Sequence, residues 1–298
     1  MLAKIKQTIA KQNFNFKTKG ILDTPPMPVI AADITYASIV TENFISMFLL
    51  SMKSFYRHMG KGKILAIIDR AMSETARETL RHHFPGIEFQ VIEEVNVGTC
   101  QRGGCWERLL TILDRAHNEY VVQVDSDTLS LGADLNEVRD CIAANRAFTL
   151  SGGEREIVSV AEAAIRAARI DHPYVGLAVE RMLPQYPGAE HLRYGRGSAG
   201  FAGFAKGGFD RARMDEFHTI MAGLMGERWT EWGTEQCASN FAVANSPGAV
   251  VLPYPKYANF EPELDETQAS FFHFIGSYRY DKGFYLKASQ QVIARLAA

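Results

Sequence analysis

A predicted strand that ends on two acids is the feature that most constrains this chain. The apolar, β-branched run Tyr120–Val124 is followed at once by Asp125-Ser126-Asp127. Such a run is typical of a buried strand in a parallel sheet, which is apolar on both faces. Because an unpaired buried charge is costly, the two acids need a cationic partner. We therefore expect Asp125 and Asp127 to hold a divalent cation that shares its oxygen ligands with a phosphate.

The first 132 residues alternate between predicted strands and helices. Strands are predicted at 29–32, 63–68, 87–91 and 120–124, and helices near 44–56, 73–84 and 106–113. This order predicts an α/β fold with a Rossmann-like, mostly parallel central sheet and helices on both faces. Ligands bind outside the carboxyl ends of such strands. Asp33, Asp69 and Asp125 are all predicted to lie at those ends.

The regular alternation of predicted strands and helices ends after Gly132. Helices are predicted near 134–145, 156–169, 208–225, 234–245 and the C-terminus, and strands at 147–150, 249–252 and 270–274. No internal repeat or low-complexity linker separates these elements. We therefore predict one domain over residues 1–298. Residues from about 25 to 132 would form its nucleotide-binding half, and residues 133–298 its acceptor- or sugar-binding half.

Composition excludes several classes of protein. The formal net charge of -2 does not favour a nucleic-acid binder. Of the four cysteines, Cys100 and Cys105 lie five apart without a second pair at zinc-ligand spacing, so no zinc site is predicted. Few cysteines in a long chain fit a reducing compartment. With neither a transmembrane-length apolar segment nor a signal-peptide core, the sequence predicts a cytoplasmic location.

The N-terminus has a local excess of positive charge. Five lysines precede the first acid, Asp23, and Leu2, Ile5 and Ile9 form an apolar stripe at helical spacing among them. One interpretation is a solvated basic arm. The other is peripheral contact with an anionic membrane, where a lipid-linked acceptor would lie.

A second group of chemically active residues lies near the C-terminus. His273 is followed by Gly276, Arg279 and Lys282. Glycine permits close approach of the backbone, and the two cations suit a diphosphate. A histidine among phenylalanines is also compatible with a core position. Two carboxylates, one imidazole and phosphate oxygens would suit Mn²⁺ or Mg²⁺, with the nitrogen ligand favouring Mn²⁺.

Three separated motifs together resemble the GT-A-type glycosyltransferases, nearest family 8 (galactosyltransferase and glycogenin-like). Ala31-Ala32-Asp33-Ile34-Thr35-Tyr36 is similar to the turn that holds the uridine, and Val124–Asp127 to the metal-binding Asp-x-Asp segment. His273-x-x-Gly276-x-x-Arg279 is similar to His-x-x-Gly-x-x-Lys, with arginine in place of lysine. The resemblance implies that Asp125, Asp127 and His273 bind metal. Donor-binding roles are predicted for Asp33, Tyr36, Asp69, Arg102, Asp125, Ser126, Gly276, Arg279 and Lys282.

A fourth segment resembles the part of the family that faces the transferred sugar. Gly233-Thr234-Glu235-Gln236-Cys237 is similar to Gly-Asp-Gln-Asp, which implies catalytic roles for Glu235 and Gln236, although Cys237 replaces an acid. A first-turn acid that stabilises a helix is the alternative for Glu235. The small-residue segment 197–203 would line the donor sugar or pack closely as a strand. Gly195–Gly200 matches Gly-x-Gly-x-x-Gly but follows no apolar strand, so no dinucleotide site is predicted.

The predicted function is therefore metal-dependent transfer of a sugar from a UDP-sugar to a sugar, glycan or lipid-linked acceptor. The resemblance implies a hexosyl transfer with retention of configuration. One alternative is a haloacid-dehalogenase-like phosphohydrolase, in which Asp125 is the nucleophile and Asp127 the acid. Thr149 or Ser151, with Lys206, would complete that set. Another alternative is a non-catalytic nucleotide-sugar binder, which only Cys237 favours.

Overall fold

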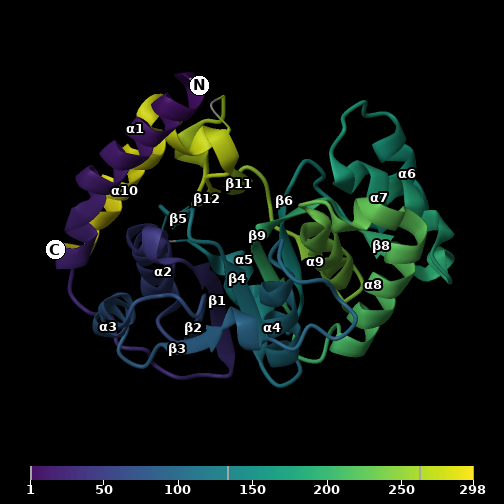
Figure 1. The fold of residues 1–298 in the computed structure, drawn as a ribbon, viewed down its shortest axis with the longest axis horizontal. Coiled ribbons are helices and arrows are strands. Elements are labelled where there is room, and N and C mark those ends of the chain that lie inside the picture. The colour runs from purple at the N-terminus through teal and green to yellow at the C-terminus, as the bar shows by residue number, and fades with distance from the viewer. Residues whose placement is uncertain (1, 133, 262, 298) are drawn as a thin grey trace. The chain divides into compact units, whose positions relative to one another are not determined.

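The computed structural model describes residues 2–132, 134–261 and 263–297, without the side chains of residues 2–7, 266, 277, 278, 281 and 282. Seven strands form one mostly parallel sheet (Figure 1). Their order is β10 (Val250–Val251), β6 (Phe148–Ser151), β9 (Gly197–Phe204), β4 (Tyr120–Val124), β1 (Ile34–Val40), β2 (Lys63–Ile68) and β3 (Glu88–Val91). The predicted α/β class is confirmed.

The chain divides into two compact units. The first contains Met1–Glu93, Val124–Asn136 and Pro255–Ala298, and the second contains Glu94–Gln123 and Glu137–Tyr254. The first unit is therefore built from three separate stretches of sequence. Whether the nucleotide-binding and acceptor-binding roles divide near residue 132 stays a prediction.

Parallel strands form the centre of the first unit. β1 pairs with β2, and β2 with β3, so that Val40 lies opposite Ile68 and Ile68 opposite Val91 at the carboxyl ends. The helices that follow β1 and β2 are α2 (Ile45–Met59) and α3 (Glu74–His83). Ser73 caps α3 by accepting from the backbone N–H of Ala76 at 3.2 Å.

A small sheet completes the first unit. Its strands are β11 (Tyr257–Asn259), β12 (Phe271–His273) and β5 (Thr128–Ser130). β12 pairs parallel to β11 and antiparallel to β5, which follows β4 almost directly. The C-terminal segment is thereby brought to the residues that follow the Asp-x-Asp strand. The terminal helices, α1 (Leu2–Thr18) and α10 (Phe284–Ala297), lie side by side (Figure 1).

Helices surround the strands of the second unit. They are α4 (Trp106–Ala116), α5 (Asn136–Ala143), α6 (Val160–Ala168), α7 (Val175–Met182), α8 (Arg211–Met225) and α9 (Thr234–Ala244). β6 is antiparallel to β9 and parallel to β10, and the short strands β7 (Val158–Ser159) and β8 (Arg193–Tyr194) pair with each other. Phe217 of α8 stacks on Phe241 of α9 with ring centroids 4.0 Å apart. The helices and strands predicted beyond Gly132 are confirmed.

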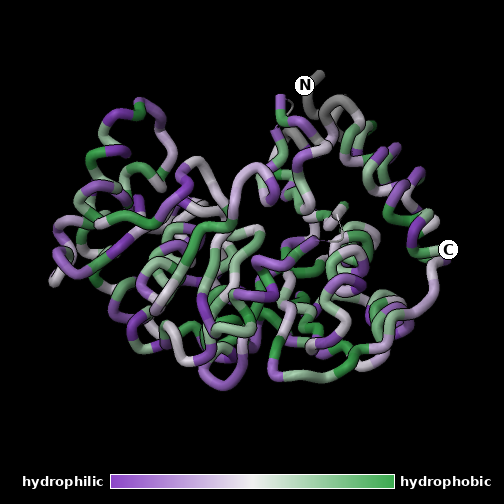
Figure 2. The backbone as a smooth tube through the Cα atoms, turned by 180° about the vertical axis from the view of Figure 1, so that it is seen from behind, coloured by the Kyte–Doolittle hydropathy of each residue, from purple (hydrophilic) through white to green (hydrophobic). Residues whose placement is uncertain are grey.

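The small residues of segment 197–203 belong to a packed strand. β9 is buried along its whole length, and a Cβ atom at Gly197 would lie 2.0 Å from Thr149 Oγ1. A Cβ atom at Gly203 would lie 2.3 Å from the Phe148 ring. The glycines are therefore needed for close contact between β9 and β6, as the packed-strand interpretation requires, while a role in lining the donor sugar stays a prediction. Figure 2 shows the backbone from the opposite side, with hydrophobic and hydrophilic residues interspersed along the chain.

The strand predicted at residues 29–32 is wrong. The first strand begins at Ile34, after Asp33, and the preceding stretch contains Pro25, Pro26 and Pro28. Ile30 in that stretch is 59% exposed, so its apolar character does not reflect burial in the sheet.

Among the described residues, the helices are each too short or too polar to cross a membrane.

Replacing Gly203 with alanine should destabilise the fold by ~1–3 kcal/mol, because the new methyl group overlaps the Phe148 ring. The matched control is Gly223→Ala on the exposed side of α8, where a Cβ atom meets nothing within 4 Å. Alanine there should be neutral or stabilising by up to ~1 kcal/mol. Urea denaturation checks both variants. Equal free energies of unfolding for Gly203→Ala and Gly223→Ala would contradict the close packing of β9.

Candidate metal centre

A tightly bonded turn places the two acids after β4. The N–H of Thr128 donates to the Asp125 carbonyl at 3.1 Å, and the hydroxyls of Thr128 and Ser51 donate to the same oxygen at 2.9 Å each. Ser126 donates its hydroxyl to the carbonyl of Ile39 at 2.9 Å. These bonds attach the turn to α2 and to the carboxyl end of β1. The carboxylates of Asp125 and Asp127 are thus presented from a fixed backbone.

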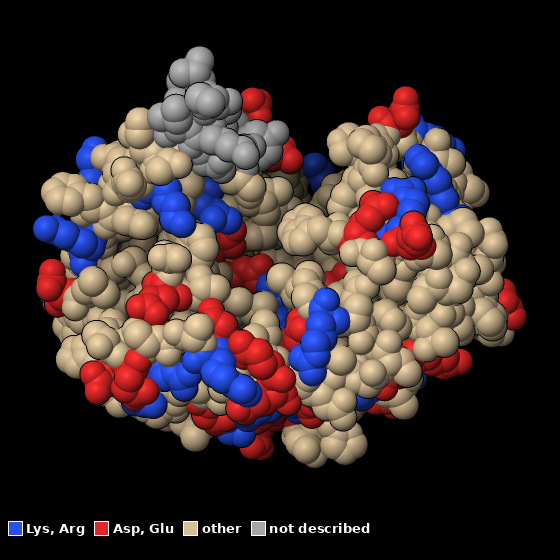
Figure 3. Space-filling view, in the orientation of Figure 1, with Lys and Arg blue, Asp and Glu red and all other residues tan. Residues whose placement is uncertain are grey.

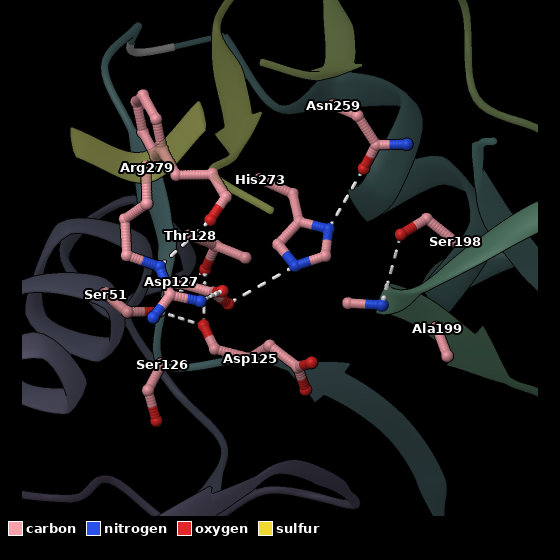
Figure 4. Close-up of polar contacts among 12 residues, drawn as sticks. Ser51, Asp125, Ser126, Asp127, Thr128, Ser198, Ala199, Asn259, His273 and Arg279 are labelled. Atoms are coloured by element: carbon pink, nitrogen blue, oxygen red, sulfur yellow. Dashed lines mark hydrogen bonds and ion pairs between the residues drawn. The ribbon is translucent and has the colours of Figure 1, made fainter. Parts of the chain in front are cut away.

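Asp127 is a nearly buried carboxylate that contacts an imidazole and a guanidinium. Its Oδ1 lies 3.2 Å from Nε2 of His273, and its Oδ2 accepts from the guanidinium of Arg279 (Figure 4). Its side chain is only 13% exposed. Burial would raise the pKa of Asp127, but His273 and Arg279 outweigh it and lower the pKa to about 2. Asp127 is therefore ionised at neutral pH.

The small sheet explains how His273 reaches this carboxylate. His273 pairs with Thr128 across the antiparallel β12–β5 ladder, and with Asn259 on the β11 side. Nδ1 of His273 lies 3.0 Å from Oδ1 of Asn259, where a protonated Nδ1 donates to the amide oxygen. This hydrogen bond orients the ring so that Nε2 faces Asp127. Such an outer partner is typical of a histidine that binds metal.

Three ligand atoms converge at the carboxyl end of β4. One atom each from Asp125, Asp127 and His273 lies within 4.8 Å of the other two. In Figure 4 the three side chains come from the β4 turn and from β12. Two carboxylates and one imidazole form a donor set suited to Mn²⁺ or Mg²⁺, with further positions left for phosphate oxygens. The residues present therefore fit a divalent cation.

The remaining donor-side candidates of the first unit are spread more widely. Asp69 directly follows β2, at the predicted carboxyl end. Gly276 begins the 3₁₀ segment η8 (Gly276–Gly283) with a φ of 53°, a left-handed conformation that favours glycine. Arg279 lies in the same segment and also donates through Nε to the Phe274 carbonyl at 3.2 Å. Lys282 lies in η8 too, but its side chain is outside the described part.

Asp33 and Tyr36 do not lie where the sequence motif predicted. Asp33 precedes β1, at the amino end of a strand of seven residues that spans about 20 Å. Ser126 contacts Ile39 at the other end of that strand. Tyr36 is fully buried, and its hydroxyl donates to the carbonyl of Lys61 at 2.8 Å. The strand-end prediction for Asp33 is therefore wrong, and Tyr36 is a packing residue.

Other residues occupy the carboxyl end of β1. β1 ends at Val40 and is followed by Thr41 and Glu42. The carboxylate of Glu42 accepts from the backbone and hydroxyl of Ser73, in the connection after β2. Sequence reasoning missed this position because the Ala-Ala-Asp-x-x-Tyr pattern matched one strand length too early. It also missed Asn259, since a single asparagine beside a phenylalanine carries no distinctive sequence signal.

The predicted residues of the second unit are engaged in internal contacts. Glu235, in the first turn of α9, forms a buried ion pair with Arg108 of α4, whose Nη2 lies 3.2 Å from each carboxylate oxygen. Gln236 donates to the Tyr174 hydroxyl at 2.9 Å and accepts from the N–H of Ala199 at 3.3 Å. Arg102 is half exposed and donates to the carbonyl of Val95 at 3.1 Å.

Comparisons with known proteins support the fold. No protein-family model and no curated protein matches the sequence. Among solved structures, an active-site glutamine-to-glutamate mutant of LgtC matches with a TM-score of 0.51 and 11% identity, over 89% of this chain and 96% of that one. The bifunctional glycosyltransferase WbbM matches with a TM-score of 0.52 and 16% identity, over 90% of this chain and 50% of that one. The glycosyltransferase GlyE of Streptococcus pneumoniae TIGR4 matches with a TM-score of 0.51 and 13% identity, over 87% of this chain and 59% of that one.

This chain thus spans about half of WbbM and nearly all of LgtC. The similarity shows that it has the GT-A fold, which confirms the predicted fold. At these identities the similarity concerns the fold alone.

The lowered pKa of Asp127 predicts a specific acid sensitivity. Its ionised form stabilises the fold above its unfolded-state pKa of about 3.8, and this stabilisation is lost as the pH falls toward about 2. In chelator-treated protein, the free energy of unfolding should fall more steeply over this range than in Asp127→Asn. Denaturant titrations at several pH values measure the slope. Parallel slopes for the two proteins would contradict the pairing.

Proposed function

We propose that the protein is a metal-dependent glycosyltransferase that uses a nucleotide-diphosphate sugar, in the first instance a UDP-sugar, as its donor. The observation that carries this proposal is the convergence of Asp125, Asp127 and His273 after a central strand of a GT-A fold. A bound diphosphate would bring two negative charges to the place where this donor set would hold a cation. Ligands of parallel sheets bind at this end of the strands.

Asp125, Asp127 and His273 would hold Mn²⁺ or Mg²⁺. When bound, the cation would neutralise the diphosphate and stabilise it as a leaving group. Asn259 keeps the histidine ring in position, and the Ser51 and Thr128 hydroxyls keep the turn rigid. These hydrogen bonds would hold the turn and the imidazole ring in place for the cation.

Arg279 provides a second positive charge. It contacts Asp127 through one nitrogen of its guanidinium and has further N–H groups that can donate. We infer that these groups bind the diphosphate, together with Lys282 and with the backbone near Gly276. Ser126 and Asp69, at the ends of β4 and β2, would contact the nucleoside side of the donor. Arginine in place of lysine would favour a two-point contact with phosphate oxygens.

We infer that Glu235 and Gln236 of the second unit act on the sugar side of the reaction. LgtC was solved as an active-site mutant in which glutamine becomes glutamate, and Gln236 offers a glutamine next to β9 here. We infer that Gln236 faces the transferred sugar and that Arg108 holds Glu235 in place beside it. A donor contact by Arg102, retention of configuration, the nature of the acceptor and a cytoplasmic location stay predictions.

The fold favours sugar transfer over phosphate hydrolysis. In the haloacid-dehalogenase-like alternative, Asp127 would act as an acid and would need to carry a proton. Here His273 and Arg279 lower its pKa to about 2, which keeps it ionised. The GT-A fold also differs from the fold that this alternative requires. Measurements of UDP release distinguish non-catalytic binding from sugar transfer.

Replacing Asp127 with asparagine should abolish Mn²⁺-dependent UDP binding, because the cation loses one of its two carboxylates. Calorimetry with and without chelator measures the binding. The matched control is Asp140→Asn, an exposed acid of α5 that should leave the affinity unchanged. Unchanged affinity in Asp127→Asn, with a normal circular dichroism spectrum, would overturn the metal assignment.

Donor turnover tests the catalytic part of the proposal. The wild-type protein with Mn²⁺ should release UDP from at least one UDP-sugar, and Asp127→Asn should not. Phosphate release from simple phosphate esters without UDP release would favour the hydrolase. Tight UDP binding with no turnover across a panel of donors and acceptors would favour the non-catalytic binder.

Asn259 should act through His273. Asn259→Leu removes the acceptor for Nδ1–H and should weaken Mn²⁺ binding by about 10- to 100-fold. Asn259→Asp keeps an acceptor oxygen and should restore most of the affinity. Electron paramagnetic resonance of free Mn²⁺ gives the affinities directly. Equal Mn²⁺ affinity in Asn259→Leu and the wild type would remove Asn259 from the site.

A further inference from the structure

The two terminal helices are strongly segregated in charge. The chain has no acid before Asp23 and none after Asp281, yet these two ends carry eight basic residues. They are Lys4, Lys6, Lys11, Lys17, Lys19, Lys282, Lys287 and Arg295. The remainder of the chain has 24 basic and 34 acidic residues. α1 and α10 lie side by side, and blue side chains lie over this part of the molecule in Figure 3.

Apolar side chains are exposed on the same part of the molecule. Eight large apolar side chains are exposed in the described part, and four of them fall within the first 30 residues. Phe16 is 68% exposed and Ile9 is 59% exposed; they are seven residues apart, so they lie on one face of α1. Leu22, 43% exposed, follows in the 3₁₀ turn η1 (Lys19–Asp23). In Figure 2, α1 alternates between hydrophobic and hydrophilic residues.

The exposed apolar face is not needed to attach α1 to the protein. Phe14 is 1% exposed and stacks on Tyr285 of α10 with ring centroids 4.6 Å apart. Thr18, one turn later, is fully buried. Ile9 and Phe16 lie on another side of the helix, beside lysines. Nζ of Lys19 lies 5.0 Å from the Phe16 ring, so a cation borders the apolar face.

We propose that α1 and η1 bind the surface of an anionic membrane. Ile9, Phe16 and Leu22 would enter the headgroup region, while Lys17 and Lys19 pair with anionic lipids. A helix with an apolar face bordered by lysines is suited to lie in the interface plane. Residues 1–22 carry five lysines and no acid before Asp23 at the end of η1, and this excess of positive charge complements a negative surface. This inference does not depend on the proposed glycosyl transfer.

Vesicle flotation of the full-length protein tests the proposal. The protein should bind vesicles that contain phosphatidylglycerol and should not bind phosphatidylcholine vesicles. Lys17→Gln with Lys19→Gln should weaken binding by on the order of tenfold or more, and added salt should do the same. Ile9→Gln with Phe16→Gln should also reduce it, because the inserted apolar area is lost.

Two control pairs match these variants. Lys61→Gln with Lys206→Gln removes the same charge from exposed sites elsewhere, and Ile165→Gln with Ile170→Gln removes exposed apolar side chains of the second unit. Both pairs should bind like the wild type. Absence of binding to anionic vesicles, or equal loss in the control pairs, would overturn the proposal. So would a dimer in ultracentrifugation that only Ile9→Gln with Phe16→Gln dissociates, since a second copy would then cover this face.

Discussion

The pairing of Asp127 with His273 and Arg279 is the interaction on which the site depends. A carboxylate that is 13% exposed would be unfavourable without compensating charge. Its partners come from the other end of the chain, with Arg279 152 residues away in sequence. The pair therefore joins the end of the β4 strand to the C-terminal segment. The same charges that stabilise Asp127 in this structure surround the place where a cation and a diphosphate would bind.

The small sheet makes this pairing possible. β5 follows the Asp-x-Asp turn directly, and β12 adds to it antiparallel, which sets His273 opposite Thr128. β11 adds on the other side and sets Asn259 beside His273. One ladder thus positions the histidine, its orienting amide and the turn that carries the acids. Hydrogen bonds from Ser51 and Ser126 connect this ladder to the larger sheet's β1 and to α2.

Sequence reasoning succeeded where a local pattern has a direct physical cause. The β-branched run before Asp125 predicts a buried strand, and two acids after it predict a cationic partner. Donor chemistry and the resemblance both associate His273 with that pair and Arg279 with the diphosphate, and the structure brings the two residues into contact with Asp127.

The failures have equally physical causes. The apolar residues before Asp33 read as a strand, but three nearby prolines and the exposure of Ile30 keep that stretch outside the sheet. The true strand carries Tyr36 inward, which a six-residue motif match does not reveal. Asn259 depends on the register of two short strands, and Arg108 reaches Glu235 across 127 residues of sequence. Such long-range contacts leave no local pattern.

The most direct test of the metal–diphosphate site is a crystal structure of the protein with Mn²⁺ and UDP, with the manganese located by its anomalous scattering. The arrangement described above predicts one strong anomalous peak bonded to Asp125, Asp127 and Nε2 of His273, with diphosphate oxygens completing its coordination and Arg279 at the phosphates. Manganese bound elsewhere, or UDP bound without contact to these residues, would contradict the proposed site.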